Sequence, residues 1–188
     1  MSAATGGLYA ADPQPSPRQA LPSAAELAYL AEYDPVLVMA NGHEISLGLE
    51  PAVAPMTAVR FLRLVRANYY DNLTFHRVVP NFVVQGGSPG ANEYMGDGPY
   101  MRDEISALSH VAGSIGISTR GRDTGDAQIF FNLVDNPRLD FEYTVFGSVI
   151  PEDIDNILEG DVISTITFEK DDENRKDFEP SSRPRGVF

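Results

Sequence analysis

Residues 75–87 read FHRVVPNFVVQGG, an apolar, strand-like stretch that contains two polar side chains. Valine and phenylalanine fill most of it, as expected of a strand packed against a core. Arg77 and Gln85 lie within it, on either side of a Pro80-Asn81 break. Burial of an unpaired guanidinium is costly, because arginine keeps its charge in proteins. Two alternatives follow: Arg77 is solvated or paired with an acidic side chain, or it lines a binding surface.

The whole chain has an ordinary globular composition with a strong acidic excess. It has 188 residues, of which 43% are hydrophobic, and a net charge of −13. The length suits one domain with tails. The negative charge argues against a nucleic-acid partner, because no basic surplus is available to displace counterions. The chain has no cysteine and only three scattered histidines, so we expect no disulfide, metal or cofactor.

Hydropathy gives no sign of a membrane segment. No apolar run approaches the ~18 residues that a membrane-spanning helix needs. The N-terminus lacks a basic region followed by an apolar one, which a signal peptide requires. We therefore expect no membrane partner and favour the cytoplasm, with a periplasmic or secreted location if a signal peptide was removed.

Short apolar runs separated by Gly- and Pro-containing turns predict a mainly β chain. Between the first two runs, Asn41-Gly42 favours a type I′ hairpin turn. The clearest helix is predicted to start at Pro55, where apolar residues recur at helical spacing, and a short helix is predicted from Pro151. The pattern is typical of a β-barrel or sandwich capped by helices. The strand runs cover residues 35–40, 43–49, 75–87, 114–118, 128–134, 143–150 and 161–168.

The two ends of the chain differ in composition from its middle. Residues 1–33 are rich in Ala and Pro and are predicted to form a partly flexible N-terminal extension that ends in a short helical turn. Residues 170–188 are charged and contain Pro, which predicts a solvated tail. One folded domain is therefore expected over residues 34–169.

A small set of polar side chains stands out within the apolar runs. Gln128 opens the run at 128–134 and shares a strand face with Phe130, since alternate strand residues point the same way. Together with Arg77 and Gln85 it makes a set of donors among phenylalanines, with no carboxylate in the same segments. Such a set is typical of an apolar ligand pocket and does not indicate hydrolytic chemistry.

Four motifs, in this order, resemble the cyclophilin family of peptidyl-prolyl cis-trans isomerases: FHRVVPNFVVQGG, GSIGIS, GRDTGDAQIFF and NPRLDFEYTVFGSVI. They lie within residues 36–168, and no insertion separates Gln128 from Gly147. The resemblance implies a closed eight-stranded antiparallel β-barrel capped by two α-helices. It also implies a bacterial-type, monomeric member of the family.

The resemblance assigns a role to ten residues. Arg77 and Gln85 are the implied catalytic residues, and Gln85 bonds the substrate backbone near the reacting amide. Arg138 stands where many members have a tryptophan that packs against cyclosporin, so weak cyclosporin binding is expected. Tyr143 replaces a common histidine, and Thr119 replaces an asparagine that binds the substrate backbone. The implied substrate-binding residues are Phe82, Val83, Ser118, Thr119, Gln128, Phe130, Leu139 and Tyr143.

The implied activity is rotation about X-Pro bonds, with proline-containing peptides and folding proteins as partners. Amide resonance makes this rotation slow, with a barrier of ~18–20 kcal/mol. A guanidinium aimed at the twisted prolyl nitrogen favours the transition state without nucleophile, metal or cofactor. The alternative is a non-catalytic module whose pocket binds X-Pro segments without speeding their exchange.

The loop between the runs 114–118 and 128–134 contains Asp123-Thr124-Gly125, which is also the triplet of aspartic proteases. Only one copy is present, and it follows Arg-Gly-Arg instead of an apolar strand. We interpret it as a loop beside the substrate groove, in which Arg120 and Arg122 influence the preference for residues that precede proline.

Overall fold

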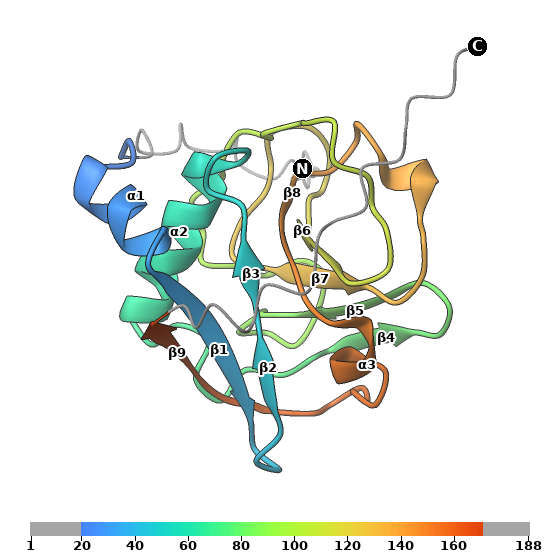
Figure 1. Ribbon diagram of the computed structural model, residues 1–188. Coiled ribbons are helices and arrows are strands. Elements are labelled where there is room, and N and C mark those ends of the chain that lie inside the picture. The colour runs from blue at the N-terminus through green and yellow to red at the C-terminus, as the bar shows by residue number, and fades with distance from the viewer. Residues whose placement is uncertain (1–19, 171–188) are drawn as a thin grey trace, which may run out of the picture.

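Two antiparallel sheets form the described part of the computed structural model, residues 20–170 (Figure 1). The smaller sheet has the order β2–β1–β9 and the larger has the order β3–β8–β6–β7–β5–β4. The smaller sheet contains Tyr33–Met39 (β1), Glu44–Ser46 (β2) and Ile163–Lys170 (β9). The larger contains Gly48–Leu49 (β3), Arg77–Val79 (β4), Val83–Gly86 (β5), Ser114–Ile117 (β6), Ile129–Asn132 (β7) and Val145–Ser148 (β8). Residues 1–19 and 171–188, most of the predicted extension and tail, lie outside the described residues.

The mainly β architecture predicted from the sequence is confirmed, with two runs divided: 43–49 into β2 and β3, and 75–87 into β4 and β5. The prediction of a single strand over residues 43–49 is wrong, because β2 pairs with β1 whereas β3 pairs with β8. The chain changes sheet at buried Leu47, whose N–H donates to the Pro35 carbonyl at 2.9 Å. A closed eight-stranded barrel stays a prediction, since the backbone hydrogen bonds define two separate sheets.

The hairpin between β1 and β2 turns at Asn41-Gly42, as predicted, but its loop has three residues. Met39 donates its N–H to the His43 carbonyl at 2.8 Å and accepts the N–H of Gly42 at 2.9 Å. Among residues 40–42 only Gly42 has a positive φ, of 86°. A type I′ turn needs positive φ at both central residues, so that prediction is wrong. A three-residue loop needs only one left-handed residue, which glycine supplies.

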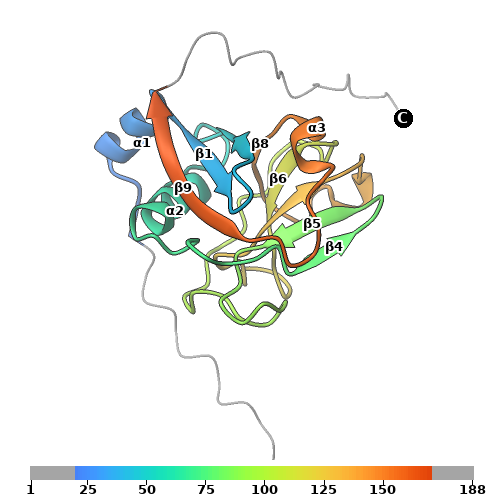
Figure 2. The same cartoon turned by 90° about the horizontal axis from the view of Figure 1, so that it is seen from below.

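Two helices pack together on one side of the sheets (Figure 2). The first, α1, is Ala24–Leu30, and the second, α2, is Pro55–Arg66, the clearest helix of the sequence. Arg63 of α2 pairs with Glu26 of α1 at 2.7 Å, and Leu30 packs against the apolar face of α2. The helical turn predicted at the end of the extension is therefore a helix that packs mainly on α2. The domain boundaries at 33/34 and 169/170 stay predictions.

The remaining helical elements are short. The helix α3, Pro151–Ile154, starts at the predicted proline and lies away from α1 and α2 (Figure 2), and Pro137–Leu139 forms a 3-10 turn, η1. Within residues 20–170, no helix has the length and apolar character of a membrane span, and no cluster of three acidic or histidine side chains is placed to bind a metal. The main core joins α2 to both sheets and includes Leu37, Phe61, Ile115, Phe131 and Phe146.

Candidate active site

The stretch 75–87 folds into a hairpin that sets Arg77 opposite Gln85. Strands β4 and β5 pair antiparallel, and these two residues are partners in the register. The connecting turn contains Asn81 with a positive φ of 56°. Arg77 Nη1 donates to Gln85 Oε1 at 3.2 Å. The Pro80-Asn81 break is therefore a turn that brings the two polar side chains of this stretch together.

Gln85 connects Arg77 to the neighbouring strands of the larger sheet. Its Nε2 donates to Ser118 Oγ at 3.0 Å and to Gln128 Oε1 at 2.9 Å. Gln128 Nε2 donates in turn to the Met95 carbonyl at 2.8 Å. Both glutamines are buried, and these bonds satisfy amide groups whose burial is otherwise costly. Adjacent strands thus bring four of the predicted site residues into one hydrogen-bond network.

Phe82 provides an aromatic surface next to two arginines. Arg77 Cζ lies 5.8 Å from the centre of its ring, and Arg138 Cζ lies 4.3 Å from it. Both separations are within the range of cation–π contacts. Phe82 is half-buried. The position at which the cyclophilin resemblance implies tryptophan is therefore occupied by a guanidinium that lies over a predicted pocket residue.

A second aromatic cluster surrounds Phe130, the register partner of Gln85 in β7. Its ring meets Tyr143 edge-on at 5.8 Å and stacks on His110 at 5.7 Å. His110 is buried, its Nδ1 lies 3.1 Å from Asn132 Nδ2, and burial lowers its pKa, which favours the neutral ring. Two predicted site residues are thus supported by a histidine that sequence analysis missed, because its segment has no periodicity.

A family model described as cyclophilin type peptidyl-prolyl cis-trans isomerase/CLD matches residues 36–178. The chain belongs to this family. A "Peptidyl-prolyl cis-trans isomerase" of Helicobacter pylori is 36% identical over 137 residues, which cover 70% of this chain and 84% of that protein. "Peptidyl-prolyl cis-trans isomerase B" of Bacillus subtilis is 36% identical over 136 residues, which cover 70% of this chain and 95% of that protein. The predicted cyclophilin identity is confirmed.

Solved cyclophilin structures share the fold. A Cryptosporidium parvum cyclophilin type peptidyl-prolyl cis-trans isomerase has a TM-score of 0.69 at 24% identity, covering 75% of this chain and 99% of that one. The same kind of protein, determined in the presence of the dipeptide ala-pro, has a TM-score of 0.68 at 23% identity and covers 73% of this chain and 99% of that one. At these identities the likeness supports the fold alone.

The remaining predicted residues of this cyclophilin are placed by separate elements. Val83 is buried in β5, Thr119 follows β6 and is half-buried, and Leu139 ends η1 and is half-buried. Within the described residues, none of the three makes a side-chain hydrogen bond or ring contact to Arg77 or Gln85. Their roles in the substrate site, like the roles assigned to the other site residues, stay predictions.

Glu93 is a neighbour of Arg77 that the sequence did not indicate. Its Oε1 lies 3.1 Å from Arg77 Nε, and both side chains are partly exposed. The strand segments lack a carboxylate, as noted from the sequence, but the loop after β5 supplies one. The first alternative for Arg77 is therefore confirmed in this cyclophilin, because the guanidinium is ion-paired. The guanidinium also lies beside the ring of Phe82, but its place in a binding surface stays a prediction.

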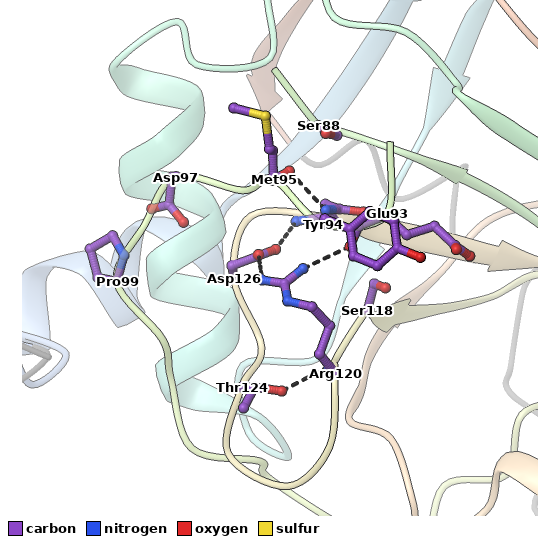
Figure 3. Close-up of polar contacts among 12 residues, drawn as sticks. Ser88, Glu93, Tyr94, Met95, Asp97, Pro99, Ser118, Arg120, Thr124 and Asp126 are labelled. Atoms are coloured by element: carbon purple, nitrogen blue, oxygen red, sulfur yellow. Dashed lines mark hydrogen bonds and ion pairs between the residues drawn. The ribbon is translucent and has the colours of Figure 1, made fainter. Parts of the chain in front are cut away.

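Arg120 connects its own loop, residues 119–127, to the loop after β5 that contains Glu93 (Figure 3). Its Nη1 donates to the Glu93 carbonyl at 2.8 Å, and its Nη2 donates to Asp126 Oδ2 at 2.5 Å. Its backbone N–H donates to Thr124 Oγ1 at 2.8 Å. Asp123 is exposed and its Oδ1 accepts the backbone N–H of Asp103, so the Asp-Thr-Gly triplet starts on the surface of this loop. The predicted position of the loop beside a substrate groove stays a prediction.

Proposed function

We propose that this cyclophilin-type isomerase uses Arg77 to stabilise the twisted amide of an X-Pro bond during cis-trans rotation. The observation that carries the proposal is the orientation of the guanidinium. Glu93 pairs with Nε, Gln85 accepts from Nη1, and the Phe82 ring lies alongside. Neither polar contact uses Nη2. An X-Pro substrate requires a hydrogen-bond donor for the prolyl amide and, next to it, an apolar surface for the proline ring.

The chemistry needs no covalent step. In the planar ground state, resonance occupies the lone pair of the prolyl nitrogen. In the twisted state the nitrogen is pyramidal and accepts a hydrogen bond, so a cationic donor stabilises the twisted state more than the planar one. An acceleration of about three decades requires ~4 kcal/mol of such differential stabilisation. One oriented guanidinium with supporting donors is sufficient for a term of this size.

In this proposal Gln85 holds the carbonyl group next to the rotating bond. Its Oε1 is occupied by Arg77, so the available group is Nε2, which donates to Ser118 and to Gln128. Ser118 is the more exposed of these two acceptors. A substrate carbonyl therefore replaces the Ser118 hydroxyl, while Gln128 continues to fix the amide plane.

Proline-containing peptides and folding proteins are the proposed partners, bound by a monomer without cofactor. The ala-pro dipeptide present with the related structure supports this ligand class. Phe82 and Phe130 supply the aromatic faces of the proposed proline pocket. The other proposed residues that line this pocket are Val83, Thr119, Leu139 and Tyr143.

We also propose that the two sheets are parts of one eight-stranded barrel. The isolated bridges of Thr74 to Ser88 and to Val162 support this proposal.

A role in folding predicts that the protein speeds a refolding phase limited by proline isomerisation. Such phases take tens to hundreds of seconds without a catalyst. We expect catalytic amounts of the wild type to shorten the phase at least about tenfold, and Arg77→Ala to leave it nearly unchanged. Fluorescence after dilution from denaturant measures both. A refolding phase without a proline step is the control, and equal acceleration by the variant would contradict the proposal.

Arg138 predicts weak binding of cyclosporin, because a charged side chain covers Phe82 where the resemblance implies tryptophan. We expect a dissociation constant above about 1 µM for the wild type, and at least about tenfold tighter binding for Arg138→Trp. Isothermal calorimetry measures both constants. Arg102→Trp, which adds the same ring at an exposed site to which no role in binding is assigned, serves as the control. A sub-micromolar constant for the wild type would refute this prediction.

A further inference from the structure

The loop of residues 88–100, here called the Glu93 loop, is held by three side chains, one from α2 and two from the connection between β6 and β7. Arg60 of α2 donates through Nη2 to the Pro99 carbonyl at 2.6 Å. Gln128 donates to the Met95 carbonyl at 2.8 Å, and Arg120 donates to the Glu93 carbonyl at 2.8 Å (Figure 3). The loop has no helix or strand of its own. Its conformation is therefore set by these contacts.

Asp126 anchors Arg120 from beneath the Glu93 loop. Its side chain is only 1% exposed, and its Oδ2 accepts Arg120 Nη2 while its Oδ1 accepts the N–H of Gln128 at 2.9 Å. The loop backbone packs so closely on this carboxylate that a Cβ added at Gly96 would overlap it. A buried carboxylate is stable only when it is paired and hydrogen-bonded in this way. Arg120 therefore holds the loop from a fixed position.

The same loop brings Glu93 to Arg77. Glu93 Oε1 lies 3.1 Å from Arg77 Nε, with side chains that are 50% and 34% exposed. Gln85 contacts the guanidinium at a different nitrogen, Nη1. Two contacts at two nitrogens fix the plane of the guanidinium as well as its position.

We propose that Glu93 is a positioning residue that orients the Arg77 guanidinium for catalysis, and that Asp126 and Arg120 hold Glu93 in place. The inference rests on the proposed role of Arg77. A partly exposed pair is screened by water, so it neutralises little of the charge at Arg77 and acts mainly through orientation. Orientation fixed before the substrate binds removes a reorganisation cost from the rotation step.

The test measures catalysed exchange of an X-Pro peptide for Glu93→Gln and Glu93→Ala, each in the wild-type and in the Arg77→Ala background. We expect Glu93→Ala to lower kcat about three- to tenfold with little change in KM. Glu93→Gln keeps an acceptor without the charge and should lose less. Neither change should have an effect when Arg77 is absent. Glu142→Gln removes a similarly exposed carboxylate that pairs with Arg122, and it should leave kcat unchanged.

A second measurement reports the orientation of the Arg77 guanidinium independently of catalytic activity. We expect the Nε–H signal of Arg77 in the NMR spectrum to be sharp and resolved in the wild type, and to shift and exchange faster with water in Glu93→Ala. An unchanged signal, or an unchanged kcat in Glu93→Ala, would overturn the inference and leave the role of Arg77 intact. Equal losses in both backgrounds would overturn it too, because Glu93 would then act independently of Arg77. Full activity of Arg77→Ala alone would overturn the proposed function itself.

Discussion

Replacement of Arg77 by alanine is expected to lower catalysed X-Pro exchange at least about 100-fold while the peptide still binds. The change removes the donor that we assign to the twisted prolyl nitrogen, and it leaves the aromatic faces of Phe82 and Phe130 in place. Exchange NMR on a short X-Pro peptide measures the rate, and a titration of the same peptide measures its dissociation constant. A loss of exchange at unchanged affinity would separate the transition-state role of Arg77 from substrate binding.

Arg77→Lys is the matched variant, because it keeps the charge and removes the planar fork. Lysine cannot contact Glu93 and Gln85 through separate nitrogens, so we expect most of the activity to be lost. Near-normal exchange in Arg77→Lys would show that charge alone is sufficient and would contradict the assigned geometry. A wild-type protein that binds the peptide without speeding its exchange would instead support the non-catalytic binding module.

Gly116→Ala is expected to weaken substrate binding about tenfold and to lower the free energy of unfolding by about 1–3 kcal/mol. Gly116 on β6 is the register partner of Phe130, and a Cβ added there would overlap the Phe130 ring. The ring must move, and it is confined on its other sides by His110 and Tyr143. A peptide titration and urea unfolding measure the two effects.

Gly48→Ala provides the control for Gly116→Ala within the same sheet. A Cβ added at Gly48 would meet Ser148 Oγ at 3.5 Å, an ordinary contact, and the residue is exposed. We expect no change in peptide affinity and less than about 1 kcal/mol of destabilisation. Unchanged affinity in Gly116→Ala would mean that Phe130 does not line the proline pocket.

The sequence by itself determined the features that depend on neighbouring residues. Short apolar runs between Gly- and Pro-containing turns marked most of the strands, and a proline followed by helical spacing marked the start of α2 at Pro55. Sequence motifs also singled out Arg77 and Gln85, together with Gln128 at the start of another strand run. In the structure, hydrogen bonds join these three side chains. Backbone periodicity and short motifs are local properties, so one chain is enough to show them.

Only the tertiary structure decided how that cluster is supported. Glu93, Arg120 and Asp126 lie in loops without periodicity, and His110 lies in a segment without regular structure. Even the start of α2 depends on a distant residue, since Glu104 accepts the N–H groups of Met56 and Thr57. Each of these contacts joins residues that are distant in the sequence or lie in loops, so no helical or strand periodicity predicts it. They form only after the sheets have brought the loops together, because an ion pair or a cap depends on the distance between side chains and not on their order in the sequence.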